Sequence, residues 1–344
     1  MCIQKRIELP LVTVITLTYM NFEHLLQTVA SVFKQDYPNI EYIISDDGSD
    51  VFPQDEIENY IKKHKTANVF CRILRHSENV GTVKHCNSAY KAANGDFVFP
   101  LSCGDIFFEE GVISAIVNRF IKTNAEIIVA TGIKYKDNFQ PICLHPHFED
   151  RKKIHSLKTG LEQYKAYITG QDYNMAWGCL TYFTKRILQR MNYFDENYVF
   201  WEDGPFLAKV LLVSKLEFAY DIVTIWYESG GLTGDNKLKR TQQFKNNART
   251  RFYNDIIKFN QHERIRHMDL FTNSEQRLIR FKVRYFYYEH SKWPALRYIV
   301  GLLFLPEYIS RIIYSHKRNQ CIRGDLKEIK RLLEITLKPS SIEI

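Results

Sequence analysis

The first 133 residues alternate between short apolar runs and amphipathic stretches. Residues 11–17 are apolar on both faces and rich in β-branched side chains, which is typical of a central parallel strand. Over residues 22–33 the apolar side chains recur at helical spacing, and Asn21 stands where it can cap this predicted helix. A second apolar strand is predicted over residues 40–45.

The same alternation continues to residue 132. It predicts helices over 54–64, 82–93 and 109–124, with strands over 68–74, 97–101 and 127–132. Such an order indicates an α/β fold with a mostly parallel central sheet and helices on both faces. Ligands bind at the carboxyl ends of the strands in these sheets, and Asp46, Asp47 and Asp105 follow predicted strand ends.

The pattern weakens beyond residue 133. Residues 134–169 look loop-rich and irregular, before a predicted strand near 178–183, a short helix, and an apolar helix over 206–213. We therefore predict a domain over 1–234, with a regular first half (1–133) and a less regular second half (134–234), followed by a basic amphipathic helical extension (235–344).

The composition is that of a folded globular protein, with 344 residues, 45% of them hydrophobic and 25% charged. Its seven cysteines are scattered and never spaced as Cys-x-x-Cys, so neither a disulfide framework nor a zinc site is indicated. The first residues lack an apolar signal core. We expect a cytoplasmic protein.

Charge is distributed unevenly. Residues 237–344 contain 23 Lys and Arg against 10 Asp and Glu, a net +13, whereas the rest contains 24 against 29, a net −5. This asymmetry favours an anionic partner, although a basic surface that only aids solubility would look the same. No zinc-finger, helix-turn-helix or RNA-binding signature accompanies it, which argues against nucleic acid.

The basic region contains one uncharged apolar run, residues 298–305, bounded by Arg297 and Pro306. It is far shorter than a membrane span. With Trp293 and several Arg and Lys residues nearby, two interpretations stay open: a helix in the membrane interface, or a helical hairpin packed on the main domain.

Two acidic segments are the candidates for chemistry. Asp46-Asp47-Gly48-Ser49 alone is a common turn, but its position after an apolar strand, with a second acidic strand end at Asp105, favours ligand binding. A sugar-nucleotide site needs groups for the base and the diphosphate, and a carboxylate that deprotonates the acceptor hydroxyl. Trp201-Glu202-Asp203 offers that carboxylate; a helix cap before Pro205 is the alternative.

Four motifs in register resemble those of family 2 glycosyltransferases and cover about two-thirds of the chain. They are 14–21; 31–41 with 46–49; 78–81 with Asn87 and 92–96; and 192–196 with 201–203. The resemblance implies a GT-A fold, a nucleotide-diphosphate sugar donor, a Mn²⁺ or Mg²⁺ ion and inversion at the anomeric carbon.

The resemblance also implies that residues 1–133 are a nucleotide-binding half with a donor pocket, and that residues 134–234 are an acceptor half. Asp46 would contact the base, Thr18 and Tyr19 would form a wall of the same pocket, and Asp47 would lie near the base or ribose. The other expected donor-binding residues are Asn21, Gly48, Ser49, Asn79, Gly81, Lys84, Ser102, Cys103 and Gly104.

For catalysis, the resemblance implies Asp203 as the general base and Glu202 as its neighbour that positions the acceptor. Trp201 is expected to stack on a sugar ring, and Trp177 to line the acceptor groove. Residues 230–234 are glycine-rich and form either a loop that closes over the donor or a plain linker.

One motif differs from the family pattern. Where the family usually has Asp-x-Asp-Asp, this chain reads Leu101-Ser102-Cys103-Gly104-Asp105. Only Asp105 is left as a carboxylate, so we predict that it binds the metal directly or through water, with weak affinity.

The sequence thus predicts an inverting transferase that moves a hexose or N-acetylhexosamine, from UDP as the expected carrier, to a lipid-linked acceptor in surface polysaccharide synthesis. Its place would be the inner membrane face. A protein-linked glycan acceptor is one alternative, and a non-catalytic nucleotide-sugar-binding module is another. A dinucleotide dehydrogenase is disfavoured, because no Gly-x-Gly-x-x-Gly follows the first strand. The oligomeric state stays open.

Overall fold

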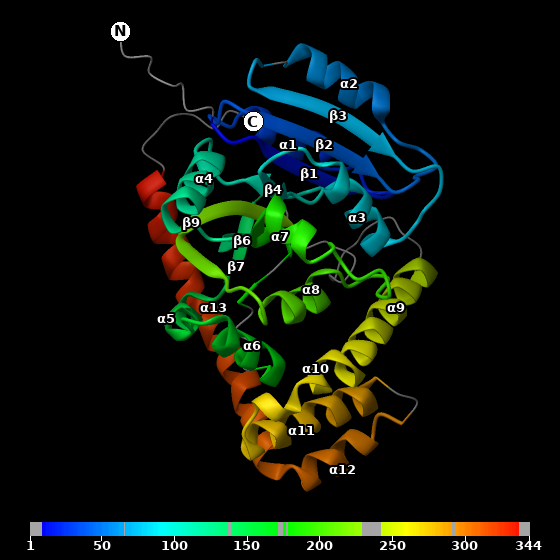
Figure 1. Ribbon diagram of the computed structural model, residues 1–344, viewed down its shortest axis with the longest axis vertical. Helices are drawn as coiled ribbons and strands as arrows, with labels where there is room; N and C mark the ends of the chain where they lie inside the picture. Colours follow the sequence, from blue (N-terminus) through cyan, green and yellow to red (C-terminus); the bar gives the residue numbers. More distant parts are fainter. Residues whose placement is uncertain are drawn as a thin grey trace. The chain divides into compact units, whose positions relative to one another are not determined.

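A computed structural model describes residues 9–64, 66–136, 139–170, 175–176, 178–228, 242–290 and 293–336 (Figure 1). The chain divides into two compact units. Unit 1 comprises Met1–Ala130, Trp177–Asn197 and Leu216–Ile225, and unit 2 comprises Thr131–Ala176, Tyr198–Lys215 and Trp226–Ile344. The predicted boundary at residue 234 lies outside the described residues and stays a prediction.

Unit 1 contains the predicted alternation of strands and helices. Its elements are β1 (Val12–Thr18), α1 (Leu25–Phe33), β2 (Ile40–Asp46), α2 (Gln54–Lys63), β3 (Val69–Arg75), α3 (Thr82–Ala92), β4 (Phe97–Pro100), β5 (Ile106–Phe107), α4 (Val112–Thr123), η2 (Gly178–Leu180), β8 (Thr181–Thr184) and α7 (Lys185–Arg190). Two strands, β6 (Ile127–Lys136) and β9 (Glu217–Glu228), begin in unit 1 and end in unit 2.

The described strands form one sheet in the order β3-β2-β1-β4-β8-β6-β9-β5, with β7 paired to β6. β1 to β4 are parallel neighbours, whereas β8 runs antiparallel to β4 and β6. Thr18 lies opposite Asp46, and Asp46 opposite Arg75. The carboxyl ends of the first three strands therefore meet at one edge, as the alternation predicts, and the α/β expectation is confirmed.

The core of unit 1 explains why the apolar runs become central strands. Val12, Val14, Ile43 and Ile44 are completely buried, because helices cover a parallel sheet on both faces. The hydroxyl of Tyr42 lies 2.9 Å from that of Thr16, so these two buried polar groups satisfy each other.

The predicted cap at Asn21 is wrong. Helix α1 begins at Leu25 with His24 in the cap position, and no side chain caps it. The carbonyl of Asn21 instead accepts hydrogen bonds from Thr18 Oγ1 at 3.2 Å and Cys103 Sγ at 3.2 Å. Asn21 therefore fixes the turn after β1, one turn before the helix.

Unit 2 is mostly helical. Its elements are β7 (Gln140–His145), η1 (Phe148–Asp150), α5 (Arg151–Ser156), α6 (Gly160–Thr169), α8 (Asp203–Val210), α9 (Gln242–Gln261), α10 (Glu263–Arg266), η3 (Met268–Leu270), α11 (Asn273–Glu289), α12 (Leu296–Leu303) and α13 (Leu305–Thr336).

The expectation that residues 134–169 are irregular is wrong. β6 continues to Lys136 and pairs with β7, and α6 follows with a complete capping box between Thr159 and Glu162. The sequence does contain that signal, Thr-x-x-Glu before a helix. Further along, Asp325 of α13 accepts hydrogen bonds from the His147 ring and the Phe148 N–H, which ties α13 to η1.

In the part of the chain that the structure describes, no helix combines the length and the apolar character needed to cross a bilayer.

Candidate active site

The acidic turn after β2 is closed by its own hydrogen bonds. Asp46 is completely buried, and its carboxylate accepts from the Ser49 N–H at 2.9 Å and the Ser49 hydroxyl at 2.6 Å. Arg75, at the end of β3, lies 3.5 Å from the same carboxylate. The Met20 N–H in turn donates to Ser49 Oγ at 2.9 Å. The ends of β1, β2 and β3 are thus joined at the predicted donor edge.

Asp47 connects this edge to the loop before α3. Its carboxylate accepts from the Val80 N–H at 2.9 Å, the Gly81 N–H at 3.2 Å and the Asn79 amide at 2.9 Å. Burial raises the pKa of the Asp47 carboxyl, although the two N–H donors oppose the shift. Asn79 and Gly81, two predicted donor residues, are therefore held directly by a third.

Gly48 is required by this close approach. Its φ of +72° lies in the left-handed region, and a Cβ there would fall 2.3 Å from the carbonyl carbon of Glu78. No larger residue fits between the two loops without moving one of them.

Helix α3 begins beside this loop. Lys84 is exposed in its first turn, whereas His85 is buried and pairs with the Ser45 hydroxyl at 2.8 Å. Burial, assisted by the charge of His76, lowers the pKa of His85 to about 4. His85 is therefore a neutral internal residue at pH 7, and Lys84 is the cation of this pair that faces solvent.

The loop after β4 contains the motif that differs from the family pattern, residues 101–105, and places it at the same edge. The Cys103 N–H donates to Leu17 O at 3.4 Å, and the Gly104 N–H donates to Thr28 Oγ1 at 3.0 Å. Ser102 is exposed, and Asp105 is buried. The predicted donor and metal residues all lie in unit 1, at the carboxyl ends of β1 and β2, in the loops after β1, β2, β3 and β4, or in the first turn of α3: Thr18, Tyr19, Asn21, Asp46, Asp47, Gly48, Ser49, Asn79, Gly81, Lys84, Ser102, Cys103, Gly104 and Asp105.

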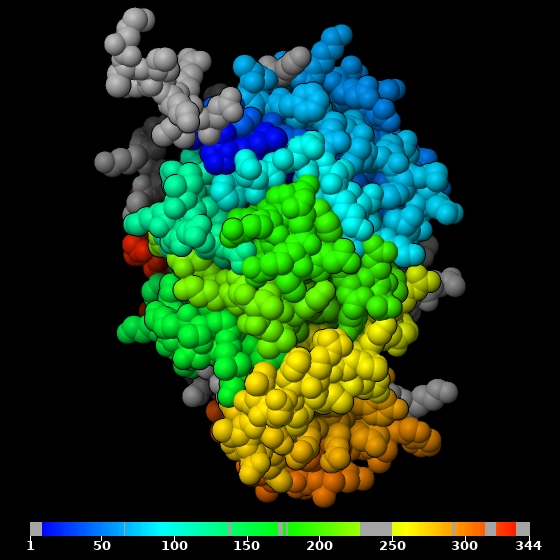
Figure 2. Space-filling model, in the orientation of Figure 1, coloured from blue at the N-terminus to red at the C-terminus, as the bar shows by residue number. Residues whose placement is uncertain are grey.

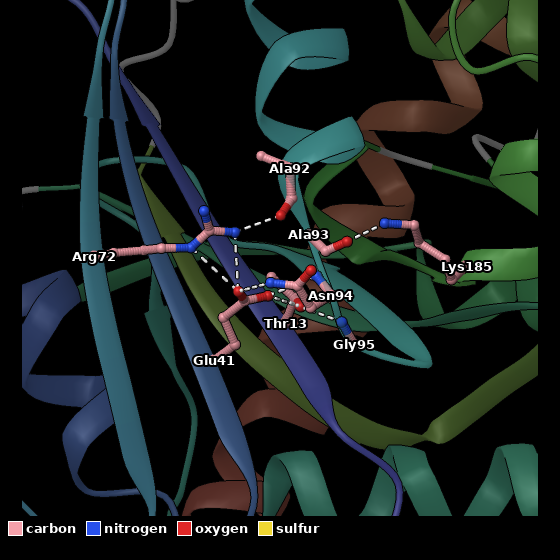
Figure 3. A network of polar contacts seen from close by, with 8 residues as sticks. All are labelled: Thr13, Glu41, Arg72, Ala92, Ala93, Asn94, Gly95 and Lys185. Atoms are coloured by element: carbon pink, nitrogen blue, oxygen red, sulfur yellow. Dashed lines mark hydrogen bonds and ion pairs between the residues drawn. The ribbon is translucent and has the colours of Figure 1, made fainter.

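At the opposite end of the strands, two motif segments, 31–41 and 92–96, are joined by hydrogen bonds. Buried Glu41 accepts hydrogen bonds from Thr13 at 2.5 Å and from the backbone and side-chain N–H groups of Asn94 at 2.7 Å each (Figure 3). Arg72 lies 2.9 Å away and also donates to the Ala92 carbonyl. Burial opposes ionisation, but these donors and Arg72 bring the pKa of Glu41 below its ordinary value. Glu41 therefore stays charged and anchors the turn after α3.

Asn87 has a similar bridging position. Its side-chain amide donates to Phe194 O at 2.9 Å and Glu196 at 2.8 Å, and its oxygen accepts from the Phe194 N–H at 2.9 Å. Two motifs more than 100 residues apart are thereby joined within unit 1.

In unit 2, one residue that the sequence analysis missed holds the predicted catalytic loop. A single carboxylate oxygen of buried Asp255, on α9, accepts from the N–H groups of Val199, Phe200 and Trp201 at 2.9, 2.7 and 3.2 Å. The available signal was that Asp255 is the only acid between residues 237 and 262, a strongly basic stretch.

Trp201 packs inside unit 2. Its ring centroid lies 5.0 Å from that of Phe259 and 6.1 Å from that of Phe252, both on α9. A Cβ on Gly204 would fall 2.1 Å from the Trp201 ring, so only glycine allows this packing. Trp201 therefore supports the loop, and its predicted stacking on a sugar stays a prediction.

Glu202 and Asp203 start helix α8. Glu202 occupies the cap position, yet its side chain makes no cap hydrogen bond, which disfavours a purely structural cap. Desolvation, with the negative charges of Asp203 and Asp255, raises the pKa of Glu202 to about 8. Glu202 therefore keeps its proton at neutral pH.

Three further expectations concern Trp177, the glycine-rich residues 230–234 and the metal ion. Trp177 and residues 230–234 lie outside the described residues. Among the described residues, no group of three or more His, Cys, Asp or Glu side chains is arranged to hold a metal ion. Asp105 thus offers a hard divalent cation a single carboxylate, and the remaining oxygen ligands of such an ion would have to come from substrate phosphates and water.

Comparison with known proteins gives concordant results. The model of the family described as Glycosyl transferase family 2 matches residues 13–196. An uncharacterized glycosyltransferase of Rickettsia prowazekii is 22% identical over 216 residues, 62% of this chain and 63% of that protein, so the chain spans less than two thirds of its length.

Two solved structures are similar in fold. S. aureus TarS 1-349, in complex with UDP-GlcNAc, has a TM-score of 0.57 and 18% identity over 87% of this chain and 79% of its own. Mannosyltransferase PcManGT from Pyrobaculum calidifontis, in complex with GDP-Man and Mn²⁺, has a TM-score of 0.54 and 14% identity over 94% and 80%, respectively.

Proposed function

The chain belongs to glycosyl transferase family 2 and has the GT-A fold, and on this premise we propose that it transfers a hexose or N-acetylhexosamine from a nucleotide-diphosphate sugar to a glycan acceptor, with inversion. The observation that supports this most strongly is the buried acidic edge of unit 1, where the matched motifs meet in one hydrogen-bonded set.

The donor half of the proposal rests on that edge. Asp46 and Asp47 hold the ends of the strands and the loop before α3 through hydrogen bonds within unit 1, and we assign the donor to this edge. Tyr19 and Ser102, both at least partly accessible, are the residues we assign to contact with the nucleotide and diphosphate. We propose UDP as the carrier; TarS was solved with a UDP-sugar and PcManGT with a GDP-sugar.

The chemical half rests on the raised pKa of Glu202 beside Asp203. With its pKa raised to about 8, Glu202 keeps its proton at neutral pH and donates a hydrogen bond to the acceptor. Asp203 is then the carboxylate that accepts the proton of the attacking hydroxyl. The hydroxyl oxygen bonds to the anomeric carbon from the side opposite the leaving nucleoside diphosphate, which inverts its configuration.

We propose Asp105 as the protein ligand of a Mn²⁺ or Mg²⁺ ion that is held largely by the donor. Such an ion would neutralise the diphosphate that leaves. The proposal predicts weak metal binding without the donor, because one carboxylate replaces the several acids usual in the family.

For the acceptor we propose a lipid-linked glycan at the inner membrane face, supported by the +13 charge of residues 237–344. A protein-linked glycan remains the second candidate, because a basic surface also suits an acidic polypeptide. A binding module without catalysis is a third, favoured by the single carboxylate of the metal motif.

The test is a screen for donor hydrolysis. The full chain is incubated with Mn²⁺ and a panel of UDP- and GDP-sugars, and release of nucleoside diphosphate is measured, since water can replace the acceptor. We expect release from one UDP-hexose or UDP-N-acetylhexosamine. Binding of a UDP-sugar by calorimetry without release or transfer would instead identify a non-catalytic module.

A further inference from the structure

Helix α12 is apolar on both of its faces. On the inner face Val300, together with Phe304 directly after the helix, is buried against Phe281 and Tyr285 of α11. On the outer face Leu302 is 73% exposed, Leu303 65% and Ile299 54%. An uninterrupted apolar helix face open to solvent is unusual in a folded protein and marks an interaction surface.

The apolar surface extends beyond α12 in both directions along the chain. Trp293, which precedes the helix, is 70% exposed. In the first turns of α13 the exposed residues recur at helical spacing: Leu305, Ile309, Ile312 and Ile313. We call the exposed side chains from Trp293 to Ile313 the apolar ridge; Figure 2 shows the surface formed by α11 and α12 in orange.

Arginines surround the apolar ridge. Arg277 and Arg284 of α11 lie over the Phe304 ring at 4.9 and 5.8 Å, Arg297 over Tyr298 at 4.9 Å, and Arg311 over Tyr285 at 4.7 Å. These contacts fix the guanidinium groups next to the apolar side chains.

The acids in this region do not cancel that charge. Residues 273–318 contain nine Lys and Arg against three Asp and Glu, a net +6. Two of the three acids are paired, Glu307 with Arg277 at 2.7 Å and Glu289 with Arg311 at 3.4 Å. The surface around the apolar ridge is therefore basic as well as apolar.

We propose that the apolar ridge docks on an anionic lipid membrane. Its leucines and isoleucines enter the boundary between headgroups and acyl chains, Trp293 lies at the headgroup level, and Arg284 and Arg297 bind lipid phosphates. A second copy of the chain is the less suitable occupant, because pairing this face with itself brings two basic surfaces together.

Docking deepens the proposed function, since it brings the enzyme to a membrane that holds a lipid-linked acceptor, but it is measured without donor or acceptor. The full chain is sedimented with vesicles of phosphatidylcholine alone and of phosphatidylcholine mixed with phosphatidylglycerol. We expect binding to the anionic vesicles that weakens as salt is raised.

Two substitutions test the apolar part. Ile299→Glu with Leu302→Glu places two charges on the outer face and is expected to lower the partition coefficient on the order of tenfold or more. The matched control, Phe70→Glu with Ile121→Glu, changes two exposed apolar residues of unit 1 and is expected to bind as the unaltered chain does. Unchanged thermal unfolding of both variants excludes a folding defect.

Arg284→Gln and Arg297→Gln test the charge. Each is expected to weaken binding to anionic vesicles about fivefold and to leave binding to neutral vesicles unchanged. Absence of binding by the unaltered chain would overturn the proposal. Normal binding by the Ile299→Glu/Leu302→Glu variant would also overturn it. The same holds if the only effect of these substitutions is to convert a dimer to a monomer, as measured by light scattering. Vesicle binding by a chain without transferase activity would leave docking intact and count against the proposed function.

Discussion

Asp255 offers the sharpest test of how the proposed catalytic loop is held. It lies 55 residues after Phe200 in the chain, yet its carboxylate accepts three consecutive N–H groups of the loop. Replacing it with alanine leaves these donors without their acceptor, and replacing it with asparagine keeps one carbonyl oxygen but removes the charge.

The size of the effect follows from the three contacts. A hydrogen bond to a charged acceptor contributes about 1.5–3 kcal/mol, and three donors that share one oxygen contribute less than three times that value. We expect Asp255→Ala to cost about 3–5 kcal/mol in loop stability, as loss of a buried charged partner does. Because a shift of about 1 Å at reacting groups can lower a rate 10²-fold, kcat should fall by about that factor.

The pH profile separates this role from a merely structural one. The Asp255 charge is one cause of the raised pKa of Glu202, after desolvation and Asp203. Asp255→Asn should therefore lower the Glu202 pKa from about 8 and move the alkaline limb of the rate profile to lower pH. The assay is donor turnover against pH, with Asp269→Asn, an exposed acid of unit 2, as the matched control.

One result would refute this reasoning. If Asp255→Ala lowers only the unfolding temperature while kcat and the pH limb stay as in the control, the carboxylate supports the fold and does not position the loop.

Three other perturbations have defined outcomes. Glu41→Gln should lower the free energy of unfolding by about 3 kcal/mol in urea at pH 7; because the Glu41 pKa is lowered, this difference should shrink as pH falls below 4.5, and an equal loss at all pH values would contradict it. Gly204→Ala should lower kcat with little change in KM, since its Cβ would fall 2.1 Å from the Trp201 ring; turnover at the normal rate would show that this packing is dispensable. Chelation with EDTA should abolish turnover and Mn²⁺ restore it, and Asp105→Asn should raise the Mn²⁺ concentration needed; activity indifferent to EDTA would exclude the metal.

The first 133 residues were predictable because their signals are local. Strand β2 was expected over 40–45 and observed as Ile40–Asp46, since an apolar run ending at an acidic turn is read without knowledge of its neighbours. The alternation alone gave only an α/β fold; the GT-A fold was implied by the resemblance of the four motifs to family 2 glycosyltransferases.

The errors arise where contacts between residues far apart in the chain determine the local structure. Asn21 looked like a helix cap, but its carbonyl is held by Thr18 and Cys103, so the helix starts later. The motif residue Glu41 is hydrogen-bonded to Asn94, 53 residues later in the chain, and this contact could not be predicted from the sequence. Asp255 could not be assigned to the proposed catalytic loop, because no local pattern shows which distant N–H groups an isolated acid will contact.

The central claim is that Asp203 takes the acceptor proton while neighbouring Glu202 keeps its own. The most direct measurement compares Asp203→Asn with Glu202→Gln in the donor turnover assay from pH 6 upward through the Glu202 pKa of about 8. We predict that Asp203→Asn loses about 10²–10⁴-fold in kcat at every pH. Glu202→Gln, which mimics a protonated acid, should keep most activity at neutral pH, and its rate should no longer fall as the pH rises through 8. Full activity of Asp203→Asn, or an inactive Glu202→Gln at neutral pH, would contradict the account.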